Sequence, residues 1–231
     1  MKINKVGLVG IGRLGKAMMT HWEKHPIKIG VYHPSETKLE PFVQQFSNSY
    51  SLTESDLLEL DVLILALPAL NVIPFISNLY SIRRLPFSTP IINMATALDT
   101  KDVKAKFPDL NILGVKYMGH ARDLLEHGNG LFITETRLPN HIEALYQYLG
   151  SIKIDQESLL SDVNKLATYY AVKAALEIER EFAKKGLPSD YVKRALTSLA
   201  PEVIRGYSEG TLGHFANEIV NEIKGNTSDD E

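Results

Sequence analysis

The sequence contains no cysteine, and this absence excludes several classes of protein. A disulfide scaffold, a thiolate zinc site, an iron–sulfur cluster and cysteine catalysis all require residues that the chain does not have. A chain without cysteine also suits the reducing conditions of the cytosol. We therefore expect a cytoplasmic protein.

An excess of one charge and long hydrophobic runs are lacking as well. The 25 Lys and Arg residues nearly balance the 28 Asp and Glu residues, which leaves a net charge of −3. This balance gives no electrostatic footprint for nucleic acid, so no nucleic-acid partner is expected. No apolar run approaches the ~20 residues that cross a bilayer, so no membrane partner is expected. The histidines show no metal-ligand spacing, and no metal site is predicted.

The first two-thirds of the chain alternate between strand-like and helix-like segments. Short apolar runs, typical of strands buried on both faces, occur at 6–11, 27–32, 62–67, 90–94, 112–117 and 130–134. Segments of helix length lie between or after them, near 13–24, 36–46, 70–80, 99–107 and 139–149. This order predicts an α/β fold: a Rossmann-type, doubly wound, mainly parallel sheet over residues 1–154.

The last third is expected to be a small all-α domain over residues 155–224. Residues 156–185 contain neither glycine nor proline, and apolar residues recur on more than one side at helical spacing. We expect a long helix here, buried against several neighbours. Further helices are predicted to about residue 205, kinked or split at Pro201, and over 209–224. This domain is expected to close the substrate pocket and to form a homodimer, and 225–231 to be a disordered tail.

The most specific motif is the glycine-rich turn G-x-G-x-x-G, which follows the first predicted strand and opens a helix. Gly10 permits the tight turn, Gly12 lets the backbone approach a pyrophosphate, and Gly15 lets the helix pack closely on the sheet. The helix start supplies the anion site. The residues predicted to bind the cofactor here are Gly10, Ile11, Gly12, Arg13, Leu14 and Gly15. The alternative is a glycine-rich turn without a ligand.

The end of the second predicted strand bears on the choice of cofactor. An Asp or Glu there would bind the ribose hydroxyls and favour NAD. This chain has a hydroxyl, an imidazole and an amine instead, from Ser35, His33 and Lys38. These groups could face a 2′-phosphate, so NADP is predicted and NAD is the alternative. Ser35 can also cap the next helix, and a cap serine can still donate to phosphate.

Several segments resemble the pyrroline-5-carboxylate reductase family, in the wider group that includes 6-phosphogluconate dehydrogenase and the deazaflavin-dependent NADP reductases. The similar segments are residues 6–18, 33–38, 61–68, 91–97 and 185–188. The resemblance implies an NADP-dependent oxidoreductase that transfers hydride to or from a small imine or carbonyl, or the corresponding amine or alcohol. It also implies that Ala66, Leu67 and Pro68 pack along the cofactor, and that Ala95 and Thr96 lie beside the nicotinamide.

Three departures from the family pattern all fall in the substrate half. Met118-Gly119-His120-Ala121 stands where the reductases have Met-Pro-Asn-Thr, and residues 166–171 replace Gly-Ser-Gly-Pro-Ala. A glycine- and threonine-rich segment of the last helical region is missing. These departures motivate an alternative from another class. The chain would then be a catalytically silent, NADP-binding regulatory or interaction protein.

Four residues are candidates for catalysis. His120 follows a predicted strand at the sheet edge where substrates bind, and histidine can act as acid or base at neutral pH. Lys165 is similar in place to a lysine that related dehydrogenases use as general acid/base. Thr168 and Tyr169 lie on the same face of the predicted helix. The alternatives are an exposed histidine, a solvated lysine and core or interface tyrosines.

Overall fold

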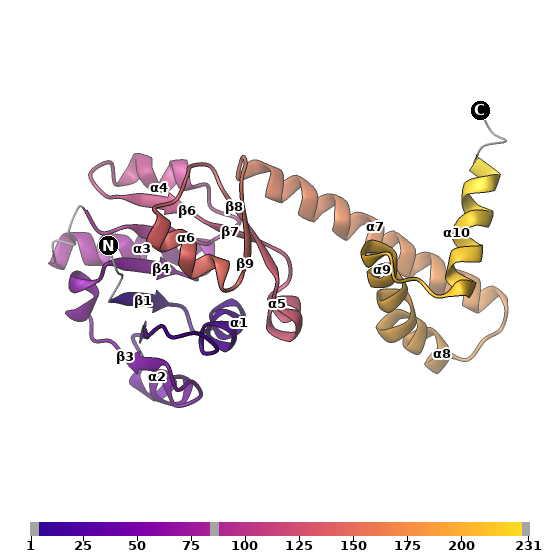
Figure 1. Cartoon of the computed structure of the whole chain (residues 1–231), viewed down its shortest axis with the longest axis horizontal. Helices are drawn as coiled ribbons and strands as arrows, with labels where there is room; N and C mark the ends of the chain where they lie inside the picture. Colours follow the sequence, from indigo (N-terminus) through magenta and orange to yellow (C-terminus); the bar gives the residue numbers. More distant parts are fainter. Residues whose placement is uncertain (1–4, 84–87, 228–231) are drawn as a thin grey trace. The chain divides into compact units, whose positions relative to one another are not determined.

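The computed structural model describes residues 5–83 and 88–227. The chain divides into two compact units, Met1–Lys165 and Leu166–Glu231 (Figure 1). The sequence predicts a boundary after residue 154, whereas the division falls within a long helix.

Six parallel strands form the main sheet of the first unit (Figure 1). In chain order they are β1 (Val6–Val9), β2 (Ile29–Tyr32), β3 (Ser49–Ser51), β4 (Val62–Leu65), β5 (Ile91–Asn93) and β6 (Ile112–Gly114). Their order across the sheet is β3-β2-β1-β4-β5-β6. This is the strand order of dinucleotide-binding folds, so the predicted Rossmann-type fold is confirmed.

Helices cover both faces of this sheet because its central strands are apolar on both sides. The helices are α1 (Arg13–Trp22), α2 (Glu36–Val43), α3 (Ala69–Arg83) and α4 (Thr100–Lys106), with a short 3₁₀ turn, η1 (Asp56–Glu59). Val62 and Ile64 of β4 pack in the same core as α1 and α2. Leu63 and Leu65 pack with α3 and α4 in the other core. The continuous apolar run of β4 therefore reflects burial on both faces.

The segment expected as one strand over 112–117 belongs to two sheets, and this expectation is corrected. β6 ends at Gly114, whereas β7 (Lys116–Met118) pairs antiparallel with β8 (Gly130–Thr134), which pairs parallel with β9 (Gly150–Ile154). Helices α5 (Ala121–His127) and α6 (Asn140–Gln147) connect these strands. Apolar runs identify strands without identifying their partners, which is why the division at Val115 was not predicted. The short strands β3 and β9 were also missed, since most of their side chains are exposed or half-buried.

The second unit is helical, as predicted. Its elements are α7 (Ser158–Lys184), whose first two turns belong to the first unit, then α8 (Ser189–Arg194), the π-helical turn η2 (Ala195–Leu199), α9 (Ala200–Glu209) and α10 (His214–Thr227). α7 ends where predicted, because Gly186 adopts a left-handed conformation (φ 64°). The helix predicted to be kinked or split at Pro201 is divided by the π-helical turn η2, and Pro201 lies in the first turn of the α-helix that follows.

Two helix limits in this unit correct the predictions. The final helix begins at His214 rather than at residue 209, because Gly210 takes a left-handed conformation (φ 70°) and ends α9. Helix α10 continues to Thr227, so residues 225–227 are helical rather than part of a tail. Residues 228–231 of the predicted tail lie outside the described residues.

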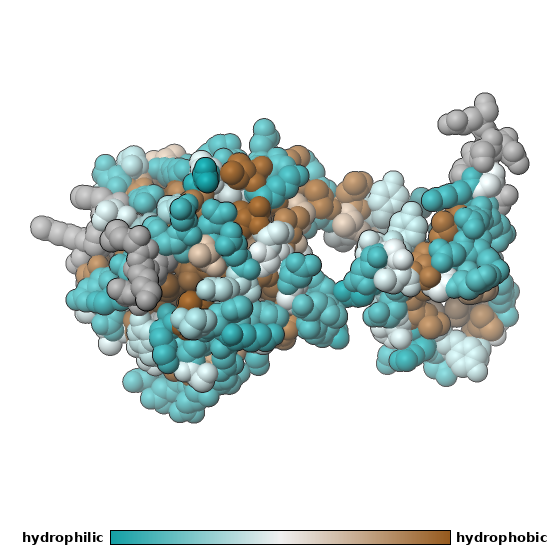
Figure 2. All heavy atoms as spheres, in the orientation of Figure 1, coloured by the Kyte–Doolittle hydropathy of each residue, from teal (hydrophilic) through white to brown (hydrophobic). Residues whose placement is uncertain are grey.

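The long helix α7 is not buried within this chain, contrary to expectation. Leu166, Tyr169 and Leu176 are 61%, 62% and 60% exposed. Figure 2 shows hydrophobic side chains (brown) at the surface of the helical unit. The apolar pattern predicted neighbours, and this single chain does not supply enough of them. Over the residues that the structure describes, no helix has both the length and the apolar character needed for a membrane span.

Candidate cofactor and substrate site

A cavity of about 460 Å³ lies at the carboxyl ends of the central strands of the first unit. This is where β1 stands between β2 and β4, the topological switch point at which open α/β sheets bind ligands. The cavity wall comes from β7 and from the segments that follow β1, β4, β5 and β7: Gly12, Arg13, Leu14, Ala66, Leu67, Pro68, Ala69, Met94, Ala95, Thr96, Ala97, Tyr117, Gly119, His120 and Ala121. The structure thus gathers predicted cofactor residues and His120 around one space.

The three glycines of the turn have different surroundings. Gly10 has a φ of 121°, and a Cβ there would collide with the carbonyl of Ala66, directly after the neighbouring strand β4. A Cβ at Gly15 would collide with the carbonyl of Gly10. A Cβ at Gly12 would meet no atom within 4 Å. The fold therefore requires Gly10 and Gly15, whereas Gly12 leaves open space, and this fits close approach by a pyrophosphate.

The start of α1 is suited to an anion. The first helical N–H groups, from Arg13 onward, have no partner within the helix by position, and the helix dipole adds positive character. No acidic residue lies in the first turn, and the Arg13 side chain is exposed there. A diphosphate would therefore meet N–H donors and one cation without a competing carboxylate.

The tip of β2 is ordered by His33 and Ser35. Nδ1 of His33 lies 3.0 Å from the backbone N–H of Ser35, which donates to it, and 3.2 Å from the Ser35 carbonyl oxygen. Ser35 occupies the N-cap position of α2, but its hydroxyl pairs with Oγ1 of Thr37 (2.9 Å) rather than with the backbone. Lys38 is exposed. These groups follow the strand next to β1 and do not line the cavity itself.

The opposite wall is built from the loop after β5 and the turn after β7. The N–H of Ala95 donates to Oδ1 of the buried Asn93 (3.1 Å). The hydroxyl of Tyr117 donates to the carbonyl of His120 (3.3 Å). Gly119 has a φ of 156°, which the fixed φ of proline excludes. A proline, as in the Met-Pro-Asn-Thr pattern, would therefore not fit the backbone of this turn at Gly119.

His120 lines the cavity and caps α5. Its Nδ1 accepts a hydrogen bond from the backbone N–H of Arg122 (3.3 Å). A neutral ring that accepts at Nδ1 carries its proton on Nε2. The side chain is exposed at the cavity wall, so Nε2 is available as a proton donor.

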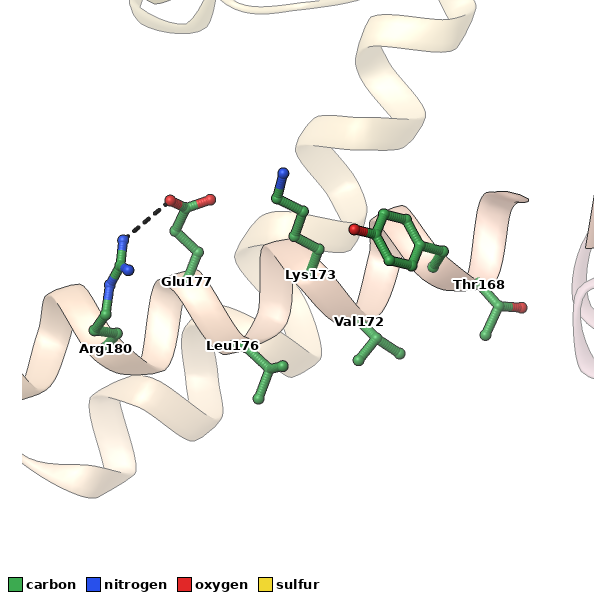
Figure 3. Close-up of a pocket in the computed structure, with 7 residues that line it drawn as sticks. Thr168, Val172, Lys173, Leu176, Glu177 and Arg180 are labelled. Atoms are coloured by element: carbon green, nitrogen blue, oxygen red, sulfur yellow. Dashed lines mark hydrogen bonds and ion pairs between the residues drawn. The ribbon is translucent and has the colours of Figure 1, made fainter. Parts of the chain in front are cut away.

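The other catalytic candidates are not among the residues that line this cavity. Thr168 and Tyr169 line a groove of about 610 Å³ on the surface of α7, and Lys165 lines neither space. Figure 3 shows Val172 and Leu176 on one side of this helix and Lys173 with the Glu177–Arg180 ion pair on the other. The roles of Lys165, Thr168 and Tyr169 stay predictions.

Sequence reasoning missed Tyr117 in the cavity wall and Lys116 beneath it. Lys116 is 1% exposed, and burial lowers its pKa to about 8. A lysine between Val115 and Tyr117 in an apolar segment was the available signal, since lysine is almost never fully buried unless it is paired. Among the described residues no group of three or more acidic or histidine side chains could hold a metal ion.

Comparison with known proteins agrees with this geometry. Residues 5–92 match the family model described as NADP oxidoreductase, coenzyme F420-dependent. No protein with a curated description matches the chain.

Three solved structures share the fold. A pyrroline-5-carboxylate reductase from Coxiella burnetii is 14% identical, with a TM-score of 0.67, over 99% of this chain and 93% of that one. An imine reductase from Myxococcus stipitatus in complex with NADP+ is 13% identical, with a TM-score of 0.65, over 89% and 78%. A reductive aminase from Aspergillus terreus in complex with NADPH and ethyl-5-oxohexanoate is 16% identical, with a TM-score of 0.60, over 91% and 79%.

These likenesses confirm the predicted resemblance. At such identities the solved structures establish the fold, and the family model covers the glycine turn, β2 and β4. The first part of this chain thus matches the F420-dependent NADP oxidoreductase family, and its fold is that of the pyrroline-5-carboxylate reductase-like oxidoreductases.

Proposed function

We propose that this chain is an NADP-dependent oxidoreductase that transfers hydride to or from a small imine or carbonyl compound, or the corresponding amine or alcohol. The observation that carries the proposal is the cavity at the switch point. Its glycine turn suits a diphosphate at one end, and small residues and a histidine form the other end. The family match and the imine-reducing enzymes of the same fold support this reaction class.

The cofactor would be held by the residues predicted from the sequence. The diphosphate would meet Gly12, Arg13 and Leu14, and the nicotinamide end would lie between Ala66–Pro68 and Ala95–Thr96. When bound, NADPH supplies the hydride, and the protein supplies orientation and a proton. NADP is favoured over NAD because His33, Ser35 and Lys38 stand where NAD-binding proteins have a carboxylate.

His120 is the proposed proton donor for the substrate heteroatom. The cap bond from Arg122 leaves the proton on Nε2 of the neutral ring. A group at the cavity wall with a proton to give can protonate an imine nitrogen or a carbonyl oxygen as hydride arrives at carbon. In the reverse direction the same nitrogen would take the proton back.

The proposed partner is a second copy of this chain. Several apolar side chains of α7 are more than half exposed in the single chain, and a homodimer would cover them. Thr168 and Tyr169 of the α7 groove would then lie in or beside that interface. The cytoplasmic location stays a prediction from composition.

Calorimetric titration with NADPH and NADH tests the cofactor site, and a panel of cyclic imines and 2-keto acids tests the reaction. The proposal expects NADPH to bind more tightly than NADH and at least one compound to be reduced. Binding of NADPH without turnover of any compound would favour the catalytically silent protein. If neither nicotinamide cofactor binds, both functions are wrong.

A further inference from the structure

Lys116 is a buried charge that the proposed reaction does not use. It lies on β7, and its side chain is 1% exposed. Its ammonium donates to the carbonyls of Ala95 (2.7 Å) and Leu98 (2.9 Å). These carbonyls belong to the loop after β5, and residues 94–97 of that loop line the cavity. The ammonium therefore hydrogen-bonds to the loop from the side that faces away from solvent.

Glu157 completes the arrangement from the start of α7. Its Oε2 lies 3.6 Å from Nζ of Lys116 and accepts a hydrogen bond from the N–H of Thr100 (3.0 Å). A Cβ at Gly114 would collide with Oε1 of Glu157, so the glycine in β6 gives the carboxylate its space. Three separate segments thus converge on one ion pair beneath the loop.

Stability alone does not account for this pair. Desolvation of a buried ion pair can exceed its Coulombic attraction, and replacing such a pair with apolar residues is often neutral or stabilising. Desolvation also lowers the pKa of Lys116 to about 8, although Glu157 favours its charged form. The ion pair therefore contributes little net folding stability, but the hydrogen bonds of Lys116 and Glu157 fix the backbone of a loop that forms the cavity wall.

We propose that Lys116 is a positioning residue that sets the shape of the nicotinamide end of the cavity by holding the Ala95 and Leu98 carbonyls, with Glu157 orienting its ammonium. The inference rests on the proposed function, because the shape of this wall affects binding only if a nicotinamide lies against it. Asn93 makes an independent contact with the Leu98 carbonyl (3.1 Å). Loss of Lys116 is therefore expected to loosen the loop without unfolding it.

Two ligands separate a positioning role from general damage. NADPH contains the nicotinamide, whereas 2′-phospho-ADP-ribose has the same adenine, phosphate and diphosphate groups without it. In Lys116→Met we expect the Kd for NADPH to rise about tenfold, as for one or two lost hydrogen bonds, and that for 2′-phospho-ADP-ribose to change by less than about twofold. The proposal would be overturned if the Kd values for both ligands rose equally, or if neither Kd changed. Lys104→Met is the control, because Lys104 is an exposed lysine on α4.

A double variant separates two roles of Lys116: hydrogen bonding to the loop carbonyls and neutralising the charge of Glu157. Lys116→Met/Glu157→Gln removes both charges, so it should regain the thermal stability that Lys116→Met loses. If Lys116 acts by holding the carbonyls, the weakened binding of NADPH persists in the double variant. If normal NADPH binding returns together with stability, Lys116 only neutralises Glu157 and the proposal is wrong. The double variant also serves if Lys116→Met does not fold.

Hydrogen exchange of the unliganded protein keeps this inference distinct from the proposed function. Lys116→Met should speed amide exchange in residues 95–100 and leave exchange in the glycine turn of residues 10–15 unchanged. This result is expected even if the wild-type protein binds neither ligand, an outcome that would disprove the proposed function alone. Unchanged exchange in residues 95–100 would overturn the positioning role whatever the ligand results.

Discussion

The first unit buries its apolar side chains on both faces of a sheet, whereas the long helix of the second unit leaves its apolar side chains exposed. Leu63 and Ile64 of β4 are fully buried between helices of the same chain. Leu166 and Leu176 of α7 are about 60% exposed. The same kind of apolar residue thus packs against other parts of the chain in one unit and remains exposed in the other.

The strongest expected effect distinguishes the catalytic candidates of the two regions. His120→Asn keeps a side-chain acceptor for the α5 cap but removes the Nε2 proton. With a substrate found by the imine panel, kcat should fall about 10²–10⁴-fold in steady-state assays. Lys165→Met and Tyr169→Phe are the matched tests on α7. If either of these loses as much activity and His120→Asn loses none, the chemistry depends on the helix instead.

The next effect concerns the glycine turn. Gly12→Val should weaken NADPH binding by at least about 100-fold in calorimetry through steric clash with the diphosphate. Its melting temperature should stay close to that of the wild type, because a Cβ at Gly12 meets no protein atom. Gly15→Val is the contrasting variant and should destabilise the fold itself, since its Cβ would collide with the Gly10 carbonyl. Tight binding of NADPH to Gly12→Val would contradict the site.

The exposed face of α7 gives a prediction about assembly. The wild-type chain should be a dimer in sedimentation equilibrium. Val172→Glu/Leu176→Glu should raise the dimer dissociation constant by about 100-fold, because it would bury two carboxylates in an apolar contact. Lys173→Gln, in the same groove, changes charge without adding a buried one and should remain dimeric. A monomeric wild-type chain would remove the contrast between the two units.

The buried lysine gives the first unit a distinctive pH dependence. Desolvation lowers the pKa of Lys116 from 10.5 to about 8, against the opposing effects of Glu157, Asp99 and Glu135. The unfolded chain therefore binds more protons at this site between those pH values, and the free energy of unfolding rises with pH there. The decrease in unfolding free energy caused by burying the charged ammonium is fully present below about pH 8 and absent above about pH 10.5.

Denaturation in urea can measure this dependence. Relative to Lys116→Met, the wild-type protein should gain about 1–3 kcal/mol of unfolding free energy between about pH 7.5 and 10. Lys173→Gln in the second unit is the control for the loss of an exposed lysine. A pH-independent difference between wild type and Lys116→Met would contradict the lowered pKa.

The smallest effect tests the choice of cofactor. His33→Asp places a carboxylate at the tip of β2, where it would repel a 2′-phosphate and accept from ribose hydroxyls. The ratio of the Kd values for NAD+ and NADP+ should shift about tenfold towards NAD+, or roughly 1.4 kcal/mol. His127→Asp makes the same change of charge at an exposed position on α5 and should leave the ratio unchanged. An unchanged ratio in His33→Asp would show that the end of β2 does not contact the ribose or its 2′-phosphate.

The sequence alone was enough to predict the elements of the first unit that depend on local pattern. The run Val62–Leu65 marked a strand buried on both faces, and the spacing of Gly10, Gly12 and Gly15 marked a turn whose geometry the structure bears out. The cavity residues Ala66–Pro68 and Ala95–Thr96 were reached through the family resemblance. These features could be predicted because each depends on residues close in sequence or on a motif with a fixed spacing.

The tertiary structure alone decided which distant segments meet. It divided the apolar run of residues 112–117 between two sheets and brought Lys116 on β7 against Glu157 at the start of α7. It also left Leu166 and Leu176 exposed. The periodicity of apolar residues indicates which side of a helix or strand is apolar. Which segment packs against that side, and which group pairs with a buried charge, depends on contacts between residues far apart in the chain.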